Sequence, residues 1–234
     1  MTWNPSPINP SQGQAPARAA VNQATYLTQA FGWMFAGLLL TAAVSVVVQG
    51  NAALLRFAYQ NFLILFIGQL AIVWGIGLGM RRINATLALG LFFVYAASLG
   101  LTVGLIVSAY TNTSVATAFL SASAMFGGAA FYGATTKRSL VGLGGFLSMA
   151  LFGLVVAIVV NVFLGASQLG FIISIVGVVL FTVLTAYNVQ RIQAGDLVAA
   201  YGSVEKASVM GALLLYLDFI NLFLFLLRLL GSRR

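Results

Sequence analysis

Seven apolar segments dominate the sequence, and each is long enough to cross a membrane as a helix. They cover approximately residues 30–48, 57–80, 85–109, 115–133, 140–164, 169–189 and 207–230. A helix rises about 1.5 Å per residue, so segments of this length span a hydrocarbon core about 30 Å thick. Backbone polar groups in lipid must be bonded within the protein, and the alternation of a β-barrel is absent. The sequence therefore predicts an all-α integral membrane protein, with a seven-helix transmembrane domain over residues 25–231.

The charged residues exclude a soluble protein and argue against a nucleic-acid partner. Only 6% of the residues are charged, against about 25% in soluble domains. The net charge of +8 comes from basic residues that stand singly or in pairs at the ends of apolar segments. This placement is typical of membrane topology signals in a lipid bilayer rather than of a nucleic-acid surface.

Catalysis and a bound cofactor are not expected from the residue types present. The chain has no cysteine and no histidine, so it lacks thiolate nucleophiles and the commonest proton shuttle and metal ligand. General acid–base chemistry needs a pair of titratable groups, and the predicted spans contain one carboxylate, Asp218. We therefore expect a protein that is not an enzyme.

The distribution of basic residues between loops predicts the orientation in the membrane. The loops after the third and fifth segments carry no charge, whereas those after the second, fourth and sixth carry Arg81 and Arg82, Lys137 and Arg138, and Arg191 with Lys206. Because Lys and Arg favour the cytoplasmic side, the amino terminus is expected there. This orientation leaves residues 228, 233 and 234, all arginines, outside. A re-entrant seventh segment would return them to the cytoplasm.

Both ends of the chain differ in composition from the predicted spans. Residues 1–24 hold all four prolines together with many Ser, Gln and Asn residues, and they contain no apolar core of a signal peptide. They are predicted to form a flexible cytoplasmic tail. Residues 232–234 form a short basic carboxy-terminal tail.

Glycine pairs at a spacing of four residues are candidates for close helix packing. Gly75 and Gly79 form one such pair, and Gly100 and Gly104 form another. Small residues at this spacing let two helix backbones approach.

The strongest candidate site is a carboxylate near the middle of the seventh segment, Asp218. An ionisable residue in lipid is costly and is expected to face protein or a water-filled space. Asn188, in the sixth segment, also needs hydrogen-bond partners, and we expect it to contact Asp218. Asn221 shares a helix face with Asp218. The pair is either a structural link between helices or, as we favour, a site of ion permeation or pH sensing.

Other polar residues are candidates to support this pair. Arg81 and Arg82, at the end of the second segment, could supply a counter-charge. Tyr187 and Tyr216 could donate hydrogen bonds, and Arg191 continues the polar stripe of Asn188.

The seventh segment resembles a known family. Residues 215–223, LYLDFINLF, continue to Leu226-Leu227-Arg228 and closely resemble the carboxy-terminal signature of the Bax inhibitor-1 family, also called the transmembrane Bax inhibitor motif family. Residues 186–192, AYNVQRI, are similar to its tyrosine–aspartate segment, and Met80-Arg81-Arg82 also fits. The resemblance covers residues 26–231 and is to a bacterial-type member, which implies a location in a bacterial inner membrane.

The resemblance implies a central last helix ringed by the other six and a calcium leak controlled by pH. It also implies two aspartates, on the sixth and seventh helices, that share protons, and a latch arginine from the second helix. By position the second aspartate is Asp218 and the latch is Arg81. The first aspartate falls on Asn188, which is a departure from the family pattern.

This departure predicts a changed response to pH and to calcium. Two close carboxylates titrate as one unit, whereas Asn188 cannot ionise and can donate a hydrogen bond that favours charged Asp218. The pH response should therefore be weakened or moved to lower pH. Calcium prefers several oxygen ligands including carboxylates, so Asp218 is a weak calcium candidate.

Three functions follow as hypotheses. The leading one is a passive leak of cations, calcium first, through a pore gated near Asp218. A second is a non-conducting modulator that binds another membrane protein, because some bacterial relatives are associated with a membrane-anchored ATP-dependent protease. A third, a transporter with alternating access, lacks the expected internal repeat and broken helices.

Overall fold

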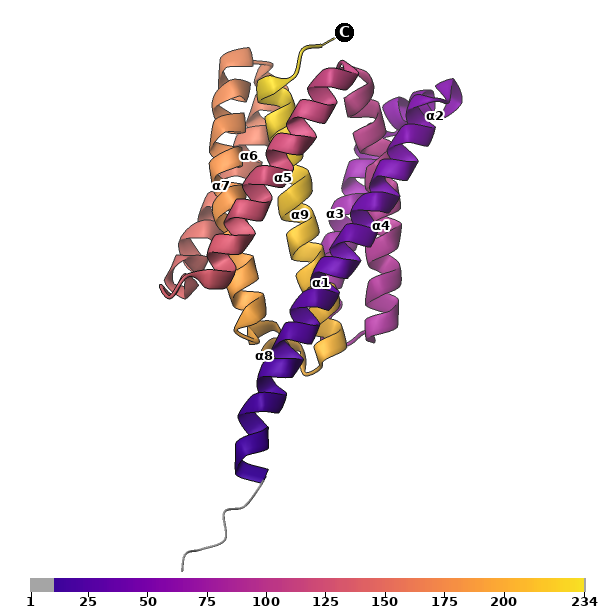
Figure 1. Ribbon diagram of the computed structural model, residues 1–234. Coiled ribbons are helices and arrows are strands. Elements are labelled where there is room, and N and C mark those ends of the chain that lie inside the picture. Colours follow the sequence, from indigo (N-terminus) through magenta and orange to yellow (C-terminus); the bar gives the residue numbers. More distant parts are fainter. Residues whose placement is uncertain (1–10, 234) are drawn as a thin grey trace, which may run out of the picture.

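The computed structural model describes the backbone of residues 11–233 and the side chains of residues 26–233. Its helices are α1 (Ser11–Gln49), α2 (Ala52–Gln60), α3 (Phe62–Gly79), α4 (Ala85–Ser108), α5 (Asn112–Thr135), a 3-10 turn η1 (Val141–Leu143), α6 (Gly144–Leu164), α7 (Ser167–Gln193), α8 (Asp196–Tyr201) and α9 (Val204–Leu230). Within this described part, seven helices are long and apolar enough to cross a membrane. The predicted all-α membrane bundle is confirmed (Figure 1).

The second predicted segment is divided in the structure. Asn51 caps the start of α2 by accepting hydrogen bonds from the amides of Ala53 and Leu54. The side chain of Asn61 then donates to the carbonyl oxygen of Phe57 at 2.9 Å and ends α2. The membrane span therefore begins at Phe62 rather than at residue 57, because an Asn side chain competes with the helix for its own backbone groups.

The amino-terminal helix starts earlier than the apolar pattern indicated. α1 is helical from Ser11, within the tail predicted over residues 1–24, and it extends beyond the rest of the bundle (Figure 1). Residues 17–20 and 24 include four alanines, which have the highest helix propensity. Residues 1–10 lie outside the described part, and the flexibility of residues 1–24 stays a prediction.

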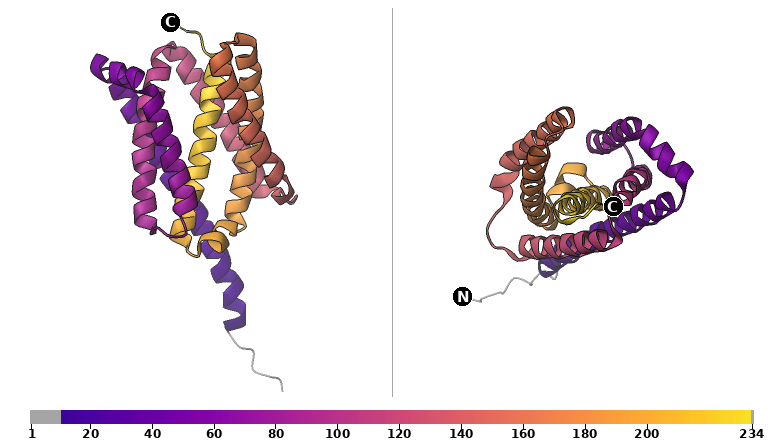
Figure 2. Two further views of the ribbon diagram at one scale, coloured as in Figure 1. Left: turned by 180° about the vertical axis from the view of Figure 1, so that it is seen from behind. Right: turned by 90° about the horizontal axis from the view of Figure 1, so that it is seen from above.

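The last helix is the central one, as expected, but fewer helices surround it than the resemblance implied. In the most apolar stretch of α9, 67% of the residues are buried, against 11% in α3 and 17% in α6. α9 packs mainly against α7, α1, α5 and α4, while α3 packs against α4 and α6 against α7 (Figure 2). The implied ring of six is therefore wrong. Large apolar side chains on the two outer helices, such as Trp74 and Phe163, are exposed and face lipid.

The re-entrant path considered for the seventh segment is also wrong. α9 is one helix of 27 residues that runs from the end of the bundle near α8, which we call the α8 end, to the opposite end, which we call the carboxy-terminal end (Figures 1 and 2). There the Thr111 amide donates to the Ser232 carbonyl at 3.2 Å, and the Arg233 guanidinium lies 5.9 Å from the centre of the Tyr110 ring. These contacts hold residues 232 and 233 at that end.

One of the two glycine pairs forms a close helix contact. A Cβ placed on Gly100 would lie 2.6 Å from the Cβ of Val44, and one on Gly104 would lie 2.9 Å from the nearest atom of α1. Gly100 and Gly104 therefore allow α4 to pack closely on α1, as predicted. Gly75 has no such neighbour within 4 Å, and Gly79 meets only a side chain at 3.8 Å. For this second pair the packing prediction is wrong.

Candidate functional site

A hydrogen-bonded pair of polar side chains joins α7 to α9 inside the bundle. The Nδ2 atom of Asn188 donates to Oδ2 of Asp218 at 2.7 Å. Both residues are buried, with 5% and 3% of their surface exposed. The contact predicted between them is confirmed. Its cause is general, since polar groups in lipid find each other when no water is available.

Close helix packing fixes the backbone near this pair. Gly133 of α5 lies directly against the backbone of Ala186, where an added Cβ would be 2.9 Å from the Ala186 Cα. Ala186 precedes Asn188 by two residues on α7. On the α9 side, the ring of Phe219 packs edge-on against Phe126 of α5, with ring centres 5.5 Å apart. The residues next to both members of the pair therefore pack against α5.

The carboxylate of Asp218 is only partly satisfied by protein. In the part of the chain that the structure describes, its one hydrogen bond comes from Asn188, and it forms no ion pair. Oδ1 therefore has no protein donor among these residues. Burying a carboxylate without a counter-charge is costly, so a proton or a cation is needed to offset the charge.

The two arginines expected near Asp218 lie elsewhere. Arg81 and Arg82 are exposed in the turn after α3, and the Arg81 carbonyl accepts a hydrogen bond from Nζ of Lys206 at 3.4 Å. Lys206 belongs to the first turn of α9, and Asp218 follows twelve residues later. At 1.5 Å per residue this is about 18 Å along the helix, beyond the reach of either arginine side chain. The latch implied for Arg81 is therefore not formed in this structure.

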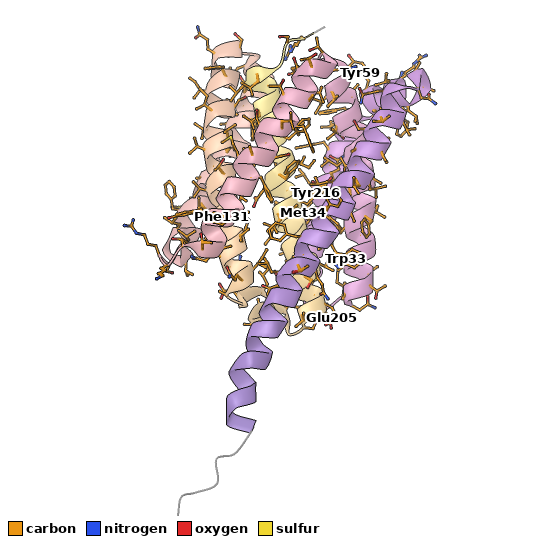
Figure 3. The ribbon with its side chains drawn as sticks, viewed as in Figure 1. Trp33, Met34, Tyr59, Phe131, Glu205 and Tyr216 are labelled. Carbon is orange, nitrogen blue, oxygen red and sulfur yellow. The ribbon has the colours of Figure 1, made fainter. Side chains whose placement is uncertain are left out.

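Asn221 and Tyr216 share the helix of Asp218 but not its contacts. The Nδ2 atom of Asn221 donates to the carbonyl of Leu217 at 2.8 Å, within α9 itself. The Tyr216 hydroxyl lies 2.6 Å from Oγ1 of Thr41 on α1. Figure 3 shows Tyr216 at mid-height of the bundle, far from Glu205 at the α8 end. Neither residue supports the pair as predicted, because each finds an acceptor or donor nearer to it.

Tyr187 and Arg191 lie together at the α8 end and line a cavity with the loop between α5 and α6. The Tyr187 hydroxyl lies beside Gly144, where an added Cβ would be 2.6 Å from its oxygen. The prediction that these two residues support Asp218 is therefore wrong. The Tyr187 side chain leaves α7 on a different face from Asn188, which follows it directly, and Arg191 lies about 4.5 Å further along the helix than Asn188, towards the α8 end.

Several buried polar residues were missed by the sequence analysis, and Gln69 and Thr41 are two of them. Gln69 of α3 is 5% exposed, and its Nε2 donates to Oγ1 of Thr102 on α4 at 2.8 Å. It is the one amide within its span, so the reasoning applied to Asn188 would have found it. Thr41 donates to the Ala96 carbonyl at 2.9 Å. A single hydroxyl gives no sequence signal, because Thr usually bonds to its own helix.

One face of α9 is left partly open by its neighbours. Half-buried residues recur along it every three or four positions, as Met210, Leu214, Leu217, Asn221 and Leu224. With 100° between successive helical residues, Asp218 borders this stripe. α3 and α6, which would have to cover it, pack on other helices. The carboxylate is thus buried, but it is next to the least covered face of the central helix.

Comparison with known proteins identifies a family that matches this chain. A family model described as "Inhibitor of apoptosis-promoting Bax1" matches residues 23–234. The inner membrane protein YbhL of Escherichia coli is 43% identical, with 90% of this chain and 92% of that protein covered. A protein of Deinococcus radiodurans is 41% identical over 89% of this chain and 91% of its own length. The Lactococcus lactis protein YrjE is 38% identical, with 88% of this chain and 90% of that protein covered.

Proposed function

This chain belongs to the Bax inhibitor-1 family, and we propose that it mediates a passive leak of calcium or other cations past Asp218, modulated by pH. The observation that carries the proposal is the state of this carboxylate. It lies within the central membrane helix, one of its oxygens is held by Asn188, and the other has no donor among the described residues. The free oxygen is available to a proton or to a passing cation.

Competition for this oxygen would couple the leak to pH. A protonated carboxyl no longer attracts a cation, whereas the carboxylate does. One carboxylate and one amide make a poor calcium site, and conduction requires that an ion bind weakly enough to leave again. The half-buried stripe beside Asp218 is the face along which a path would open. In the arrangement described here the pair is buried, which corresponds to a closed pore.

We also propose that the α8 end faces the cytoplasm of a bacterial inner membrane. Six described basic residues lie at or near that end: Arg81, Arg82, Lys137, Arg138, Arg191 and Lys206. Three described basic residues lie at the carboxy-terminal end: Arg56, Arg228 and Arg233. Lys and Arg favour the cytoplasmic side. The Escherichia coli relative YbhL is named as an inner membrane protein.

A second candidate function is favoured by the shape of α1. Its first residues extend beyond the bundle at the α8 end (Figure 1). A helix that extends from a membrane domain can present a surface to a second membrane protein, such as a membrane-anchored ATP-dependent protease. In that case the protein would be a modulator that conducts no ions.

Deleting residues 1–24 separates the two functions. The first apolar segment starts near residue 30, so calcium uptake into proteoliposomes should continue at the wild-type rate after the deletion. Empty vesicles provide the background. Uptake by the intact chain at the background rate would remove the leak proposal. Co-purification of a membrane protein with the full chain, lost on deletion, would then favour the modulator.

A further inference from the structure

A cavity of about 230 Å³ opens at the α8 end between the α5–α6 loop and the end of α7. Its lining includes three basic side chains, from Lys137, Arg138 and Arg191, and three neutral polar ones, from Ser139, Tyr187 and Gln190. No carboxylate belongs to the lining. The cavity lies apart from the Asn188–Asp218 pair, and the proposed leak does not use it.

The loop that carries two of these cations is fixed to α7. Gln190 accepts a hydrogen bond from the Leu140 amide at 2.7 Å through Oε1. Through Nε2 it donates to the Arg138 carbonyl at 2.9 Å. Both ends of one side-chain amide thus hold the loop backbone, one residue away from Arg191 on the same helix. Lys137 and Arg138 therefore extend from an anchored backbone beside a third cation.

The charges in this cavity have no partner in the described part of the chain. None of its three basic residues forms an ion pair there, and the two acidic residues at this end belong to α8 and to the first turn of α9. Like charges held together repel one another, at a cost that a bound anion would offset. The Tyr187 hydroxyl lies at Gly144, the first residue of α6, where the helix dipole also favours negative charge.

We propose that this cavity binds the phosphate group of an anionic ligand. Arg pairs with phosphate through two parallel hydrogen bonds, and Lys adds a point charge. Two sources have this chemistry: the headgroup of a phospholipid and a soluble phosphate compound. Exposed apolar side chains of the adjoining helices, Phe131 of α5 and Phe146 of α6, are available to acyl chains. Figure 3 shows Phe131 on the outer surface of the bundle, towards the α8 end.

Thermal unfolding of the purified full chain in an uncharged detergent tests the proposal. The probes are a short-chain phosphatidylglycerol and inorganic phosphate, each compared with potassium chloride at the same ionic strength. At least one of them should raise the unfolding temperature of the wild type. Arg138→Gln and Arg191→Gln should each raise the half-effective concentration of that probe about tenfold, because each removes a charged hydrogen-bond donor.

A matched control variant and the two probes distinguish the possible outcomes of this experiment. Arg56→Gln removes an exposed cation at the other end of the bundle and should respond like wild type. Stabilisation by phosphatidylglycerol alone, lost in the cavity variants, identifies a lipid headgroup. Stabilisation by inorganic phosphate as well, with the same loss, identifies a general phosphate site. No stabilisation beyond that of salt, or equal stabilisation of the cavity variants and wild type, overturns the proposal.

Discussion

Replacing Asp218 by Asn is expected to lower calcium uptake into proteoliposomes to nearly the rate of empty vesicles. The change keeps the size of the side chain and removes its charge, so it isolates electrostatic attraction from packing. A cation that passes through a low-dielectric region depends on such charges. Loss of the only carboxylate near the middle of a described membrane span should reduce uptake at least about tenfold.

The same substitution elsewhere provides the control for this prediction. Asp196→Asn changes a carboxylate of α8, outside the spans, and should leave uptake unchanged. Asp218→Asn should also fold, because it removes a buried charge that has no counter-ion among the described residues. A thermal unfolding temperature at or above that of wild type would verify this. Wild-type uptake by a folded Asp218→Asn variant would place the ion path elsewhere.

The largest loss of stability is expected from Gly133→Ala. An added methyl group would lie 2.9 Å from two backbone atoms of Ala186 and closer still to its carbonyl oxygen. Backbone atoms cannot move aside as a flexible side chain can, so α5 must shift away from α7. Overpacking of this kind costs about 1–3 kcal/mol. The shift would also disturb Asn188, two residues along α7.

Gly128→Ala is the matched control on the same helix. A Cβ at Gly128 would meet nothing within 4 Å, and Ala in a helix is favoured over Gly by about 0.5–1 kcal/mol. Thermal unfolding in detergent should therefore show a lower unfolding temperature for Gly133→Ala and an equal or higher one for Gly128→Ala. Equal effects of the two substitutions would contradict the close contact between α5 and α7.

The fold was largely predictable because lipid demands long apolar helices. What the sequence could not provide is which apolar face meets protein and which meets lipid, since lipid tails are as apolar as leucine. For this reason α3 and α6 resemble the other spans in sequence, although they pack outside the helices that surround α9. The division at Asn61 was missed for a different reason, because a single capping side chain interrupts the apolar run without changing its composition.

At the site, the Asn188–Asp218 contact was predictable because each side chain needs a partner in the membrane. The supporting residues were not, because an Asn or a Tyr has several partners within reach. Asn221 bonds to its own helix and Tyr216 to Thr41. The latch implied for Arg81 is not formed because Arg81 and Asp218 lie at different depths along the bundle. Arg81 ends its span, whereas Asp218 lies in the middle of another, and the rise of the helix separates them.

Calcium uptake into proteoliposomes from about pH 5 to pH 8, compared for wild type and Asn188→Asp, tests the central claim most directly. Asn188 lies 2.7 Å from the carboxylate, so a second carboxylate there would share a proton with the first. Uptake by wild type should change little over this range, whereas uptake by Asn188→Asp should fall steeply as the pH is lowered. Identical pH profiles, or no uptake by either chain above that of empty vesicles, would contradict a leak gated by this pair.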